Sequence, residues 1–330
     1  MAACGGGGGG GEGGGEESIT LSYAFFAPIA SFPGVQMEEW AERMDECTDG
    51  QVEVEFFPGG SLLGSGDIYD GVSEGVVDIG MDSPAYDVGR FPLSSAVSLP
   101  VGFTNAEVAS KTFLDLLTEY EPAEFDGYEI VTAFTTEPAY LQTQQPITSR
   151  SDLSGRELRA AGAGVPALQA LGASPVGMPM PNVAESLQTG VITGYMSSRE
   201  VLQDFGLAEQ VSYVTDYPFG ISNSFVAVMD EGRFAELPED VQQCIQDLRP
   251  EMAEFASQYH DQDNVQPALE WAASEHGVET VELEPGEQEA FDETLSQLVD
   301  TWVDEVGGDF DPQEVLDRVE ELRDQYSAEN

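Results

Sequence analysis

Strand-like and helix-like segments alternate along residues 19–83, and this order constrains the fold more than any other feature of the chain. Residues 19–26 read ITLSYAFF, which is typical of a strand, and a helix-like segment follows. Residues 51–60 alternate between polar and apolar side chains, 65–75 have the length of a short helix, and 76–83 read as a third strand. This order predicts an α/β unit with a largely parallel sheet.

The helix expected after the first strand has clear start and stop signals. Pro33 lies near its first turn, and Gly50 is placed to end it. Four apolar side chains recur at helical spacing and form one stripe; they are Met37, Trp40, Ala41 and Met44. The stripe predicts that this helix packs against the sheet.

A second unit of the same kind begins near residue 128. Its expected strands are YEIVTAFTT, YLQTQQPI, ASPVGMP and the end of PNVAESLQTGVITGYMSS, with VPALQALG as a helix between them. Residues 201–229 contain a short helix and two more strands, of which the last is apolar enough to be a buried crossing between lobes. The C-terminal third is mostly helical, with helices expected over about 237–275, 285–305 and 311–327 and a strand in VETVEL. A chain of this length is expected to form two lobes.

The composition is strongly acidic, and this excludes several partners. Of the 330 residues, 62 are acidic and 11 basic, which gives a net charge of −51; Lys111 is the one lysine. Such a surface is screened at about 1 M salt, where the Debye length is about 3 Å, so we expect a halophile's protein. Nucleic acid is an unsuitable partner because no stretch clusters basic residues. The 41% of hydrophobic residues can fill a core, which favours a folded chain over a disordered one.

The cysteines and histidines indicate no metal site. Cys4, Cys47 and Cys244 are too few and too scattered for a disulfide framework or a zinc cluster, and His260 and His276 are the only imidazoles. The sequence contains no run of about 18 apolar residues, so it predicts no membrane-spanning helix.

The N-terminal residues have the composition of a tether. MAACGGGGGGGEGGGEES resembles the end of a lipoprotein signal, with Cys4 as the acylated residue, followed by a flexible glycine-rich segment. A plain linker is the alternative. If the resemblance holds, the protein is exported and held by lipid at the outer face of the cytoplasmic membrane, or is periplasmic.

The order of local motifs resembles the substrate-binding proteins of TRAP (tripartite ATP-independent periplasmic) transporters. The matching segments are FFPGGSLLGSGDIYDGVSEGVVDIGMDSPA, SLPVGFTNAEVA, DLSGRELRAAGAGVPALQALGASPVGMPMPNVAESLQTGVITG and FVAVMDEGRFAELPEDVQQCI. The resemblance covers about residues 18–300. It implies a two-lobed periplasmic-binding-protein fold, type II-like, with hinge strands and a long helix that spans the lobes. It implies no cofactor, and partners that are an organic acid and the membrane subunits of the transporter.

The same resemblance sets the expected lobe boundaries. The tether takes residues 1–17. Lobe I takes 18–138 with about 226–270, and lobe II takes 139–225 with about 271–330. A ligand would bind between the lobes and be captured when they close.

Arg159 is the residue that matches the carboxylate-binding arginine of that family. A guanidinium offers a planar fork of donors to a carboxylate and keeps its charge at any working pH. The alternative is an ion pair, for instance with Glu185. Arg156, three residues earlier, is expected to have a structural role on the surface beside Asp152 and Glu157.

Other positions depart from the family pattern. Ser197 stands where many members have asparagine, Met196 replaces an acid, and Ala139 stands about where some members have a second arginine. These departures argue against ligands that need two cations and leave a more apolar pocket.

Several side chains near expected strand ends are candidates to face the cleft. The aromatic candidates are Phe25, Phe26, Tyr86, Tyr140 and Phe219, and the polar ones are Ser83 and Asn223. Core packing is the alternative for each aromatic ring. Together these side chains predict a monocarboxylate with an apolar or aromatic body as the ligand.

Competing functions lack their motifs. No H-E-x-x-H or G-x-x-x-x-G-K sequence is present, and with only two histidines a nucleophile–base pair is hard to build. A hydrolase is therefore disfavoured, although the sequence GVSEG at residues 71–75 matches G-x-S-x-G and paired carboxylates for glycoside hydrolysis stay open among so many acids. A binding protein of an ATP-driven transporter would share the two-lobed architecture and the tether. A structural surface-layer component would bind no small molecule.

Overall fold

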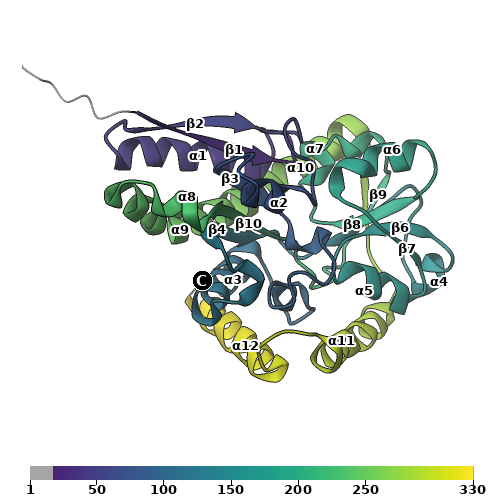
Figure 1. Cartoon of the computed structure of the whole chain (residues 1–330). Coiled ribbons are helices and arrows are strands. Elements are labelled where there is room, and N and C mark those ends of the chain that lie inside the picture. Colours follow the sequence, from purple (N-terminus) through teal and green to yellow (C-terminus); the bar gives the residue numbers. More distant parts are fainter. Residues whose placement is uncertain (1–17, 330) are drawn as a thin grey trace, which may run out of the picture.

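The computed structural model describes residues 18–329. It contains two sheets, each covered by helices (Figure 1). The strands are β1 (Ile19–Phe25), β2 (Val52–Phe57), β3 (Ile79–Asp82), β4 (Tyr128–Thr135), β5 (Tyr140–Thr143), β6 (Glu157–Ala160), β7 (Ser174–Gly177), β8 (Gly194–Ser197), β9 (Tyr213–Thr215), β10 (Ser224–Asp230) and β11 (Glu279–Val281).

The longer helices carry most of the packing against these sheets. The α-helices are α1 (Phe32–Cys47), α2 (Ile68–Ser73), α3 (Ala106–Tyr120), α4 (Arg150–Leu153), α5 (Gly164–Leu171), α6 (Val183–Gln188), α7 (Val201–Asp204), α8 (Glu231–Ala235), α9 (Glu239–Tyr259), α10 (Val265–His276), α11 (Glu287–Glu305) and α12 (Pro312–Glu329). Short turns of other helix types are η1 (Pro84–Tyr86), η2 (Ser94–Ser98), η3 (Ala123–Phe125), η4 (Met180–Asn182), η5 (Leu207–Glu209) and η6 (His260–Asn264).

The first sheet has the strand order β2-β1-β3-β10-β4. Strands β1, β2 and β3 are parallel, as the alternating order of the sequence predicts, whereas β10 runs antiparallel between β3 and β4. Because β10 enters from the second lobe, it crosses between the lobes and is buried along Ser224–Met229. The apolar run in that segment therefore indicated its place correctly.

The second sheet has the order β11-β9-β5-β8-β6-β7. Strands β6, β7 and β8 are parallel, and β5 is antiparallel to β8 and β9. Two hydrophobic clusters lie around each sheet, so the chain has separate cores rather than one. The two-lobed α/β fold expected from the sequence is confirmed.

Residues 239–276 form the helical segment that was expected to span the lobes, called the spine below, and it consists of three consecutive parts. We expected a continuous helix over about 237–275, but α9 and α10 are joined by the π-helical turn η6. That turn brings His260 into the interior, where its side chain is 0% exposed. A π-turn inserts an extra residue and rotates the side chains that follow it.

The C-terminal helices form a strap across both lobes (Figure 1). Helix α11 packs on α5 of the second lobe, and α12 packs on α3 of the first. Val315, Leu316 and Val319 belong to a hydrophobic cluster of the first lobe, and Arg318 pairs with Glu119 at 2.6 Å. The lobe boundaries as a whole stay a prediction, but this packing corrects the place of α12, which we expected in lobe II.

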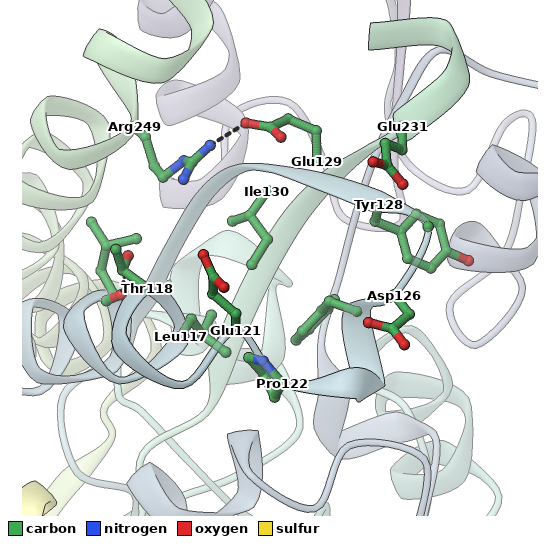
Figure 2. Close-up of a pocket in the computed structure, with 13 residues that line it drawn as sticks. Leu117, Thr118, Glu121, Pro122, Asp126, Tyr128, Glu129, Ile130, Glu231 and Arg249 are labelled. Atoms are coloured by element: carbon green, nitrogen blue, oxygen red, sulfur yellow. Dashed lines mark hydrogen bonds and ion pairs between the residues drawn. The ribbon is translucent and has the colours of Figure 1, made fainter. Parts of the chain in front are cut away.

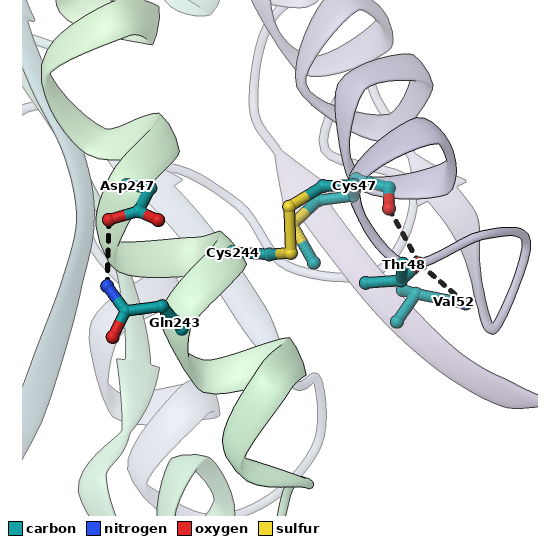
Figure 3. Close-up of a disulfide and its surroundings, with 7 residues drawn as sticks. Cys47, Thr48, Val52, Gln243, Cys244 and Asp247 are labelled. Atoms are coloured by element: carbon teal, nitrogen blue, oxygen red, sulfur yellow. Dashed lines mark hydrogen bonds between the residues drawn. A yellow bond between two sulfur atoms is a disulfide. The ribbon is translucent and has the colours of Figure 1, made fainter.

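One disulfide joins α1 to α9, between Cys47 and Cys244 (Figure 3). The sequence predicted no framework of several disulfides, and this single bond was not foreseen. The two cysteines lie 197 positions apart in sequence, yet α1 and α9 pack side by side on the same lobe. Cys4 lies outside the described residues.

Candidate ligand-binding cleft

Arg159 lies in the middle of β6, and its side chain is 0% exposed. Its Nε donates to the carbonyl oxygen of Met178 at 2.8 Å, and Nη1 donates to that of Met196 at 3.4 Å. Nη2 has no hydrogen-bond partner. No carboxylate of residues 18–329 lies within ion-pair distance, so the alternative pairing with Glu185 does not form.

Such an arginine is unusual because it is charged, buried and paired only with carbonyl dipoles. Burial lowers the pKa of Arg159, while the nearby Tyr86 and Tyr195 raise it in part. A guanidinium nevertheless stays protonated in proteins, so its charge remains in the interior. Buried charges are as a rule paired with a counter-ion, and the chain itself supplies none here. The free donor at Nη2 is suited to an anion from outside.

A pocket between the lobes adjoins this arginine. Phe26 and Tyr86 line it from the first lobe, Ser197 lines it from the second, and Asn223 lines it from the crossing before β10. These are four of the residues that the sequence predicts for the site. The pocket measures only ≈ 20 Å³. Since an apolar cavity of about 150 Å³ holds a benzene molecule, a ligand needs the lobes to move apart.

Two hydrogen bonds cross the cleft. The Tyr86 hydroxyl accepts one from the amide of Met180 at 3.3 Å, and Asp204 accepts one from the amide of Phe32 at 3.1 Å. These contacts link the two lobes directly, η1 to η4 and the start of α1 to the end of α7. Opening the cleft has to break them.

Aromatic rings form the first-lobe wall of the pocket. The ring of Phe26 lies 5.4 Å from that of Tyr86 and 6.3 Å from that of Phe225, measured between centroids. Phe32 lies 5.8 Å from Phe225. The Arg159 guanidinium carbon lies 5.9 Å from the centre of the Tyr86 ring. An apolar body is therefore surrounded by rings, with the guanidinium at one side.

Two buried hydroxyl groups near the cleft have no hydrogen-bond partner. The Oγ atoms of Ser197 and Ser83 are both unpaired, and their side chains are 1% and 2% exposed. Ser197 lines the pocket directly, whereas Ser83 lies beside η1 and outside the lining. An unmade hydrogen bond of a buried group costs about 1–3 kcal/mol, so Ser197 is suited to a ligand oxygen.

Tyr140 and Phe219 do not line this pocket. Phe219 packs against Tyr217 and Phe291 in the core of the second lobe. The Tyr140 ring lies under the guanidinium of Arg199, 4.0 Å away. Both rings fill space within their own lobe, the alternative that the sequence left open. Phe25 does line the pocket, beneath Phe26.

Arg199 connects the end of β8 to the crossing between β4 and β5. Its Nε and Nη2 donate to the carboxylate of Glu137 at 2.9 Å and 2.6 Å, and its backbone amide donates to the same group at 3.0 Å. Glu137 lies in the crossing between β4 and β5, so this fork ties the end of β8 to the crossing. Arg156 makes a weaker contact, through Nε to the backbone carbonyl of Asp152 at 3.1 Å rather than to the expected carboxylates.

Glu200 and Asp204 also line the pocket, and the sequence identified neither of these acids as a site residue. Glu200 accepts hydrogen bonds from Ser198 at 2.7 Å and forms an ion pair with His260 at 3.1 Å. Burial lowers the pKa of His260, but Glu200 and Asp261 raise it to about 10, so this imidazole carries a charge. No signal in the sequence separated these two acids from the other sixty.

A larger pocket lies away from the cleft, between α3 and β4 (Figure 2), with a volume of ≈ 350 Å³. Its lining carries four carboxylates, from Glu121, Asp126, Glu129 and Glu231. The one basic side chain, Arg249, is already paired with Glu129. An organic anion is repelled there, so the cleft is the better candidate site.

Within residues 18–329, no group of histidine, cysteine and acidic side chains is arranged to hold a metal ion. In the same part of the chain no helix combines the length and the apolar character needed to cross a bilayer.

Comparison with known proteins places these features in a family. Residues 27–305 match the family described as bacterial extracellular solute-binding protein, family 7. A solute-binding protein of Roseobacter denitrificans is 28% identical over 63% of this chain and 65% of its own, so the chain spans just under two thirds of that relative. The ectoine/5-hydroxyectoine-binding periplasmic protein UehA of Ruegeria pomeroyi is 27% identical, over 69% of this chain and 68% of its own.

Two solved structures are similar over nearly the whole length. A TRAP periplasmic solute-binding protein from Desulfovibrio salexigens is 38% identical, with a TM-score of 0.82, and the match covers 95% of this chain and 98% of that one. A marine metagenome TRAP protein specific for aromatic acid ligands, solved with 3-hydroxybenzoate, is 26% identical, with a TM-score of 0.87 and coverage of 94% and 99%. The chain belongs to family 7 of the bacterial extracellular solute-binding proteins.

Proposed function

We propose that this protein captures an organic acid for a TRAP transporter, by pairing the ligand carboxylate with Arg159 while the two lobes close around it. The ligand is a monocarboxylate with an apolar or aromatic body. The observation that carries the proposal is the fully buried guanidinium of Arg159, which has a free donor and no carboxylate of the described chain beside it. The similar TRAP structures favour this transporter class over an ATP-driven one.

The two walls of the cleft supply different interactions. The second lobe provides the guanidinium and the unpaired hydroxyl of Ser197, and the first lobe provides the rings of Phe26, Tyr86 and Phe225. A carboxylate therefore docks on one lobe and gains its apolar contacts from the other only after closure. Differential contacts of this kind let a ligand shift the balance between open and closed states.

The class of ligand is inferred from the aromatic rings of the pocket and from one position, Ala139, at which this chain departs from the family pattern. Ala139, 3% exposed, stands where a second arginine would supply another cation. A ligand with two acidic groups would therefore have a basic partner, Arg159, for only one of them. The marine metagenome protein is specific for aromatic acids, which supports the same class for this chain.

The setting of the protein follows from its family and surface. We place it outside the cytoplasm, held to a membrane by a lipid on Cys4 and the following tether. The net charge of −51 suits concentrated salt, in which remote carboxylates are screened and only nearby charges act strongly on the ligand. Mass spectrometry of the purified native protein would detect acylation of Cys4.

The decisive experiment compares two arginines. Arg159→Ala should weaken binding of benzoate or 3-hydroxybenzoate by about 3–5 kcal/mol, because a buried carboxylate loses its partner. Arg156→Ala is the matched control, since this side chain is half-buried on the same lobe and contacts only a backbone carbonyl of the chain. Both variants are measured by calorimetry in concentrated salt.

The expected result is loss of binding in the first variant and unchanged affinity in the second. Equal affinity of Arg159→Ala and the unmodified protein for the same acid would contradict the proposal. Circular dichroism and thermal unfolding of both variants establish that each is folded, so that a loss of binding reports on the site.

A further inference from the structure

The cleft carries an acid that has no basic ion-pair partner among residues 18–329. Asp204 ends α7 and lines the pocket, and it is half-buried. Its Oδ2 accepts the hydrogen bond from the Phe32 amide at 3.1 Å, and its Oδ1 accepts one from Asn264 at 3.2 Å. Among residues 18–329 no basic side chain forms an ion pair with it. Both bonds come from neutral groups.

The surroundings of Asp204 leave its negative charge uncompensated. Burial and the neighbouring Glu200 raise the pKa of Asp204 to about 7, while the Phe32 amide, Asn264 and His260 lower it only in part. Tyr259 also faces this carboxylate from the spine. A like charge and poor hydration both disfavour the ionised form, and a cation placed beside Asp204 would relieve both.

Glu200 is not the group that would receive such a cation. Its two oxygens are already engaged by Ser198 and by the charged His260, and its side chain is 2% exposed. It adds negative potential to the pocket without offering a free face. Both oxygens of Asp204 are engaged as well, but by neutral donors, and its side chain is half-buried, so Asp204 is the better acceptor for a cation.

A second and independent observation shows that this pocket is built for a polar ligand. The hydroxyl of Ser197 lines the pocket, is 1% exposed, and has no hydrogen-bond partner. The adjoining Nη2 of Arg159 also lacks a partner. The pocket and its border thus offer two donors that lack an acceptor, on Ser197 and Arg159, and one carboxylate that lacks a cation, on Asp204.

Aromatic rings border the acid. Phe32 and Phe205 line the pocket with Asp204, and Phe225 lies 5.8 Å from Phe32. Ring faces attract cations through their quadrupole, by about 0.5–2 kcal/mol depending on desolvation. A carboxylate beside such rings is a suitable environment for an ammonium or amidinium group.

Resting on the proposed function, we propose that the ligand is a zwitterion: its carboxylate pairs with Arg159, and a cationic group at the other end of its apolar body pairs with Asp204. On binding, the cation takes the place of the Phe32 amide on Asp204 or shares the carboxylate with it. The ligand then links the lobes where that hydrogen bond links them now. A neutral aromatic acid lacks this second anchor.

The test uses pairs of acids that differ only by a charged group. The pairs are gamma-aminobutyrate and pentanoate, epsilon-aminohexanoate and heptanoate, and para-aminomethylbenzoate and para-ethylbenzoate. Each pair replaces an ammonium by a methyl group of similar size, and the three pairs cover different lengths. Calorimetry in concentrated salt at about pH 8, where Asp204 is ionised, should show at least one amino acid binding about tenfold or more tighter than its partner.

Two variants assign that preference to Asp204. Asp204→Asn keeps an oxygen for the Phe32 amide but removes the charge, so the tenfold preference should vanish. Glu209→Gln is the control, because this acid is the exposed last residue of the turn η5 and lies outside the pocket lining, and the preference should persist. Lowering the pH to about 6 protonates Asp204, whose pKa is about 7, while the amine keeps its proton; the preference should shrink.

Equal or tighter binding of the uncharged acid in all three pairs, or a preference that survives in Asp204→Asn, would overturn the zwitterion proposal. Either result leaves the carboxylate proposal standing as long as Arg159→Ala abolishes binding of the uncharged acids. If Arg159→Ala changes nothing, the proposed function fails instead. The two failures are therefore distinguishable.

Discussion

The exterior of this protein and its cleft treat basic side chains in opposite ways. On the exterior most of the rare cations are paired with the abundant acids: Arg43 with Glu39, Arg90 with Asp70, Arg233 with Asp78, and Arg318 with Glu119. In the cleft, Arg159 is fully buried, and its hydrogen-bond acceptors within residues 18–329 are two carbonyl oxygens. Arg150 and Arg156 also have no ionic partner in the described part of the chain, but among these three only Arg159 is fully buried.

This difference shows that pairing on the exterior follows from abundance, whereas the isolation of Arg159 is decided by which strands and side chains pack around it. The neighbours of Arg159 across the sheet are Val176 on β7 and Tyr195 on β8. Neither can neutralise a guanidinium at neutral pH, because burial raises the pKa of Tyr195 well above its usual value. The packing around β6 therefore leaves the charge available to a ligand.

The largest effect on stability is expected from the disulfide, which joins the exposed Cys47 to the buried Cys244 away from the cleft. Replacing both Cys47 and Cys244 by serine should lower the free energy of unfolding by about 2–5 kcal/mol, because the bond closes a very long loop. Affinity for benzoate should stay within about twofold, since both residues lie outside the pocket lining. Thermal unfolding and calorimetry measure the two quantities. A large loss of affinity in a folded variant would show that exterior and cleft are coupled.

The second change gives the cleft arginine the partner that the exterior ones have. In Val176→Glu, a carboxylate lies next to Arg159 on the same face of the sheet, at the roughly 5 Å spacing of neighbouring strands. It should pair with the guanidinium and weaken benzoate binding about 100-fold, or about 2.8 kcal/mol.

Val176→Gln is the matched control, because it adds the same bulk without charge. It should retain most of the affinity, as measured by the same titration. If both variants lose binding equally, bulk rather than charge is responsible, and the contrast between cleft and exterior has a steric origin.

The smallest effect concerns a single exterior pair. Arg318→Gln removes the fork onto Glu119 that links α12 to α3. Exposed pairs are worth about 0–1 kcal/mol and are screened by salt, so the loss in stability should be under about 1 kcal/mol and shrink further in concentrated salt. Thermal unfolding at low and high salt checks this. A loss of several kcal/mol would mean that the strap is held mainly by this pair.

Much of the fold was predictable because it depends on local periodicity. The stripe of Met37, Trp40 and Met44 placed α1 correctly, and all three side chains are 0% exposed. A ligand-binding role for Arg159 was suggested by the family resemblance. Its complete burial within the strand over residues 157–160 was not predicted.

Other features could not be predicted because they depend on contacts between distant segments. Phe219 and Phe26 are both aromatic residues near strand ends, yet one fills the core of a lobe and the other lines the cleft. The helix α12 has an ordinary amphipathic pattern that does not say which lobe it covers. The interruption at His260 is likewise set by the buried groups that surround the imidazole.

The sequence by itself determined the alternation of strands and helices, the acidic exterior and the scarcity of bases, because each is a property of short segments or of composition. Only the tertiary structure decided that Cys47 meets Cys244, that Asp204 among 62 acids faces the cleft, and that Arg159 has no acid beside it. The physical reason is that pairing and isolation are relations between groups far apart in the chain. They exist only once packing has brought some of those groups together and kept others away.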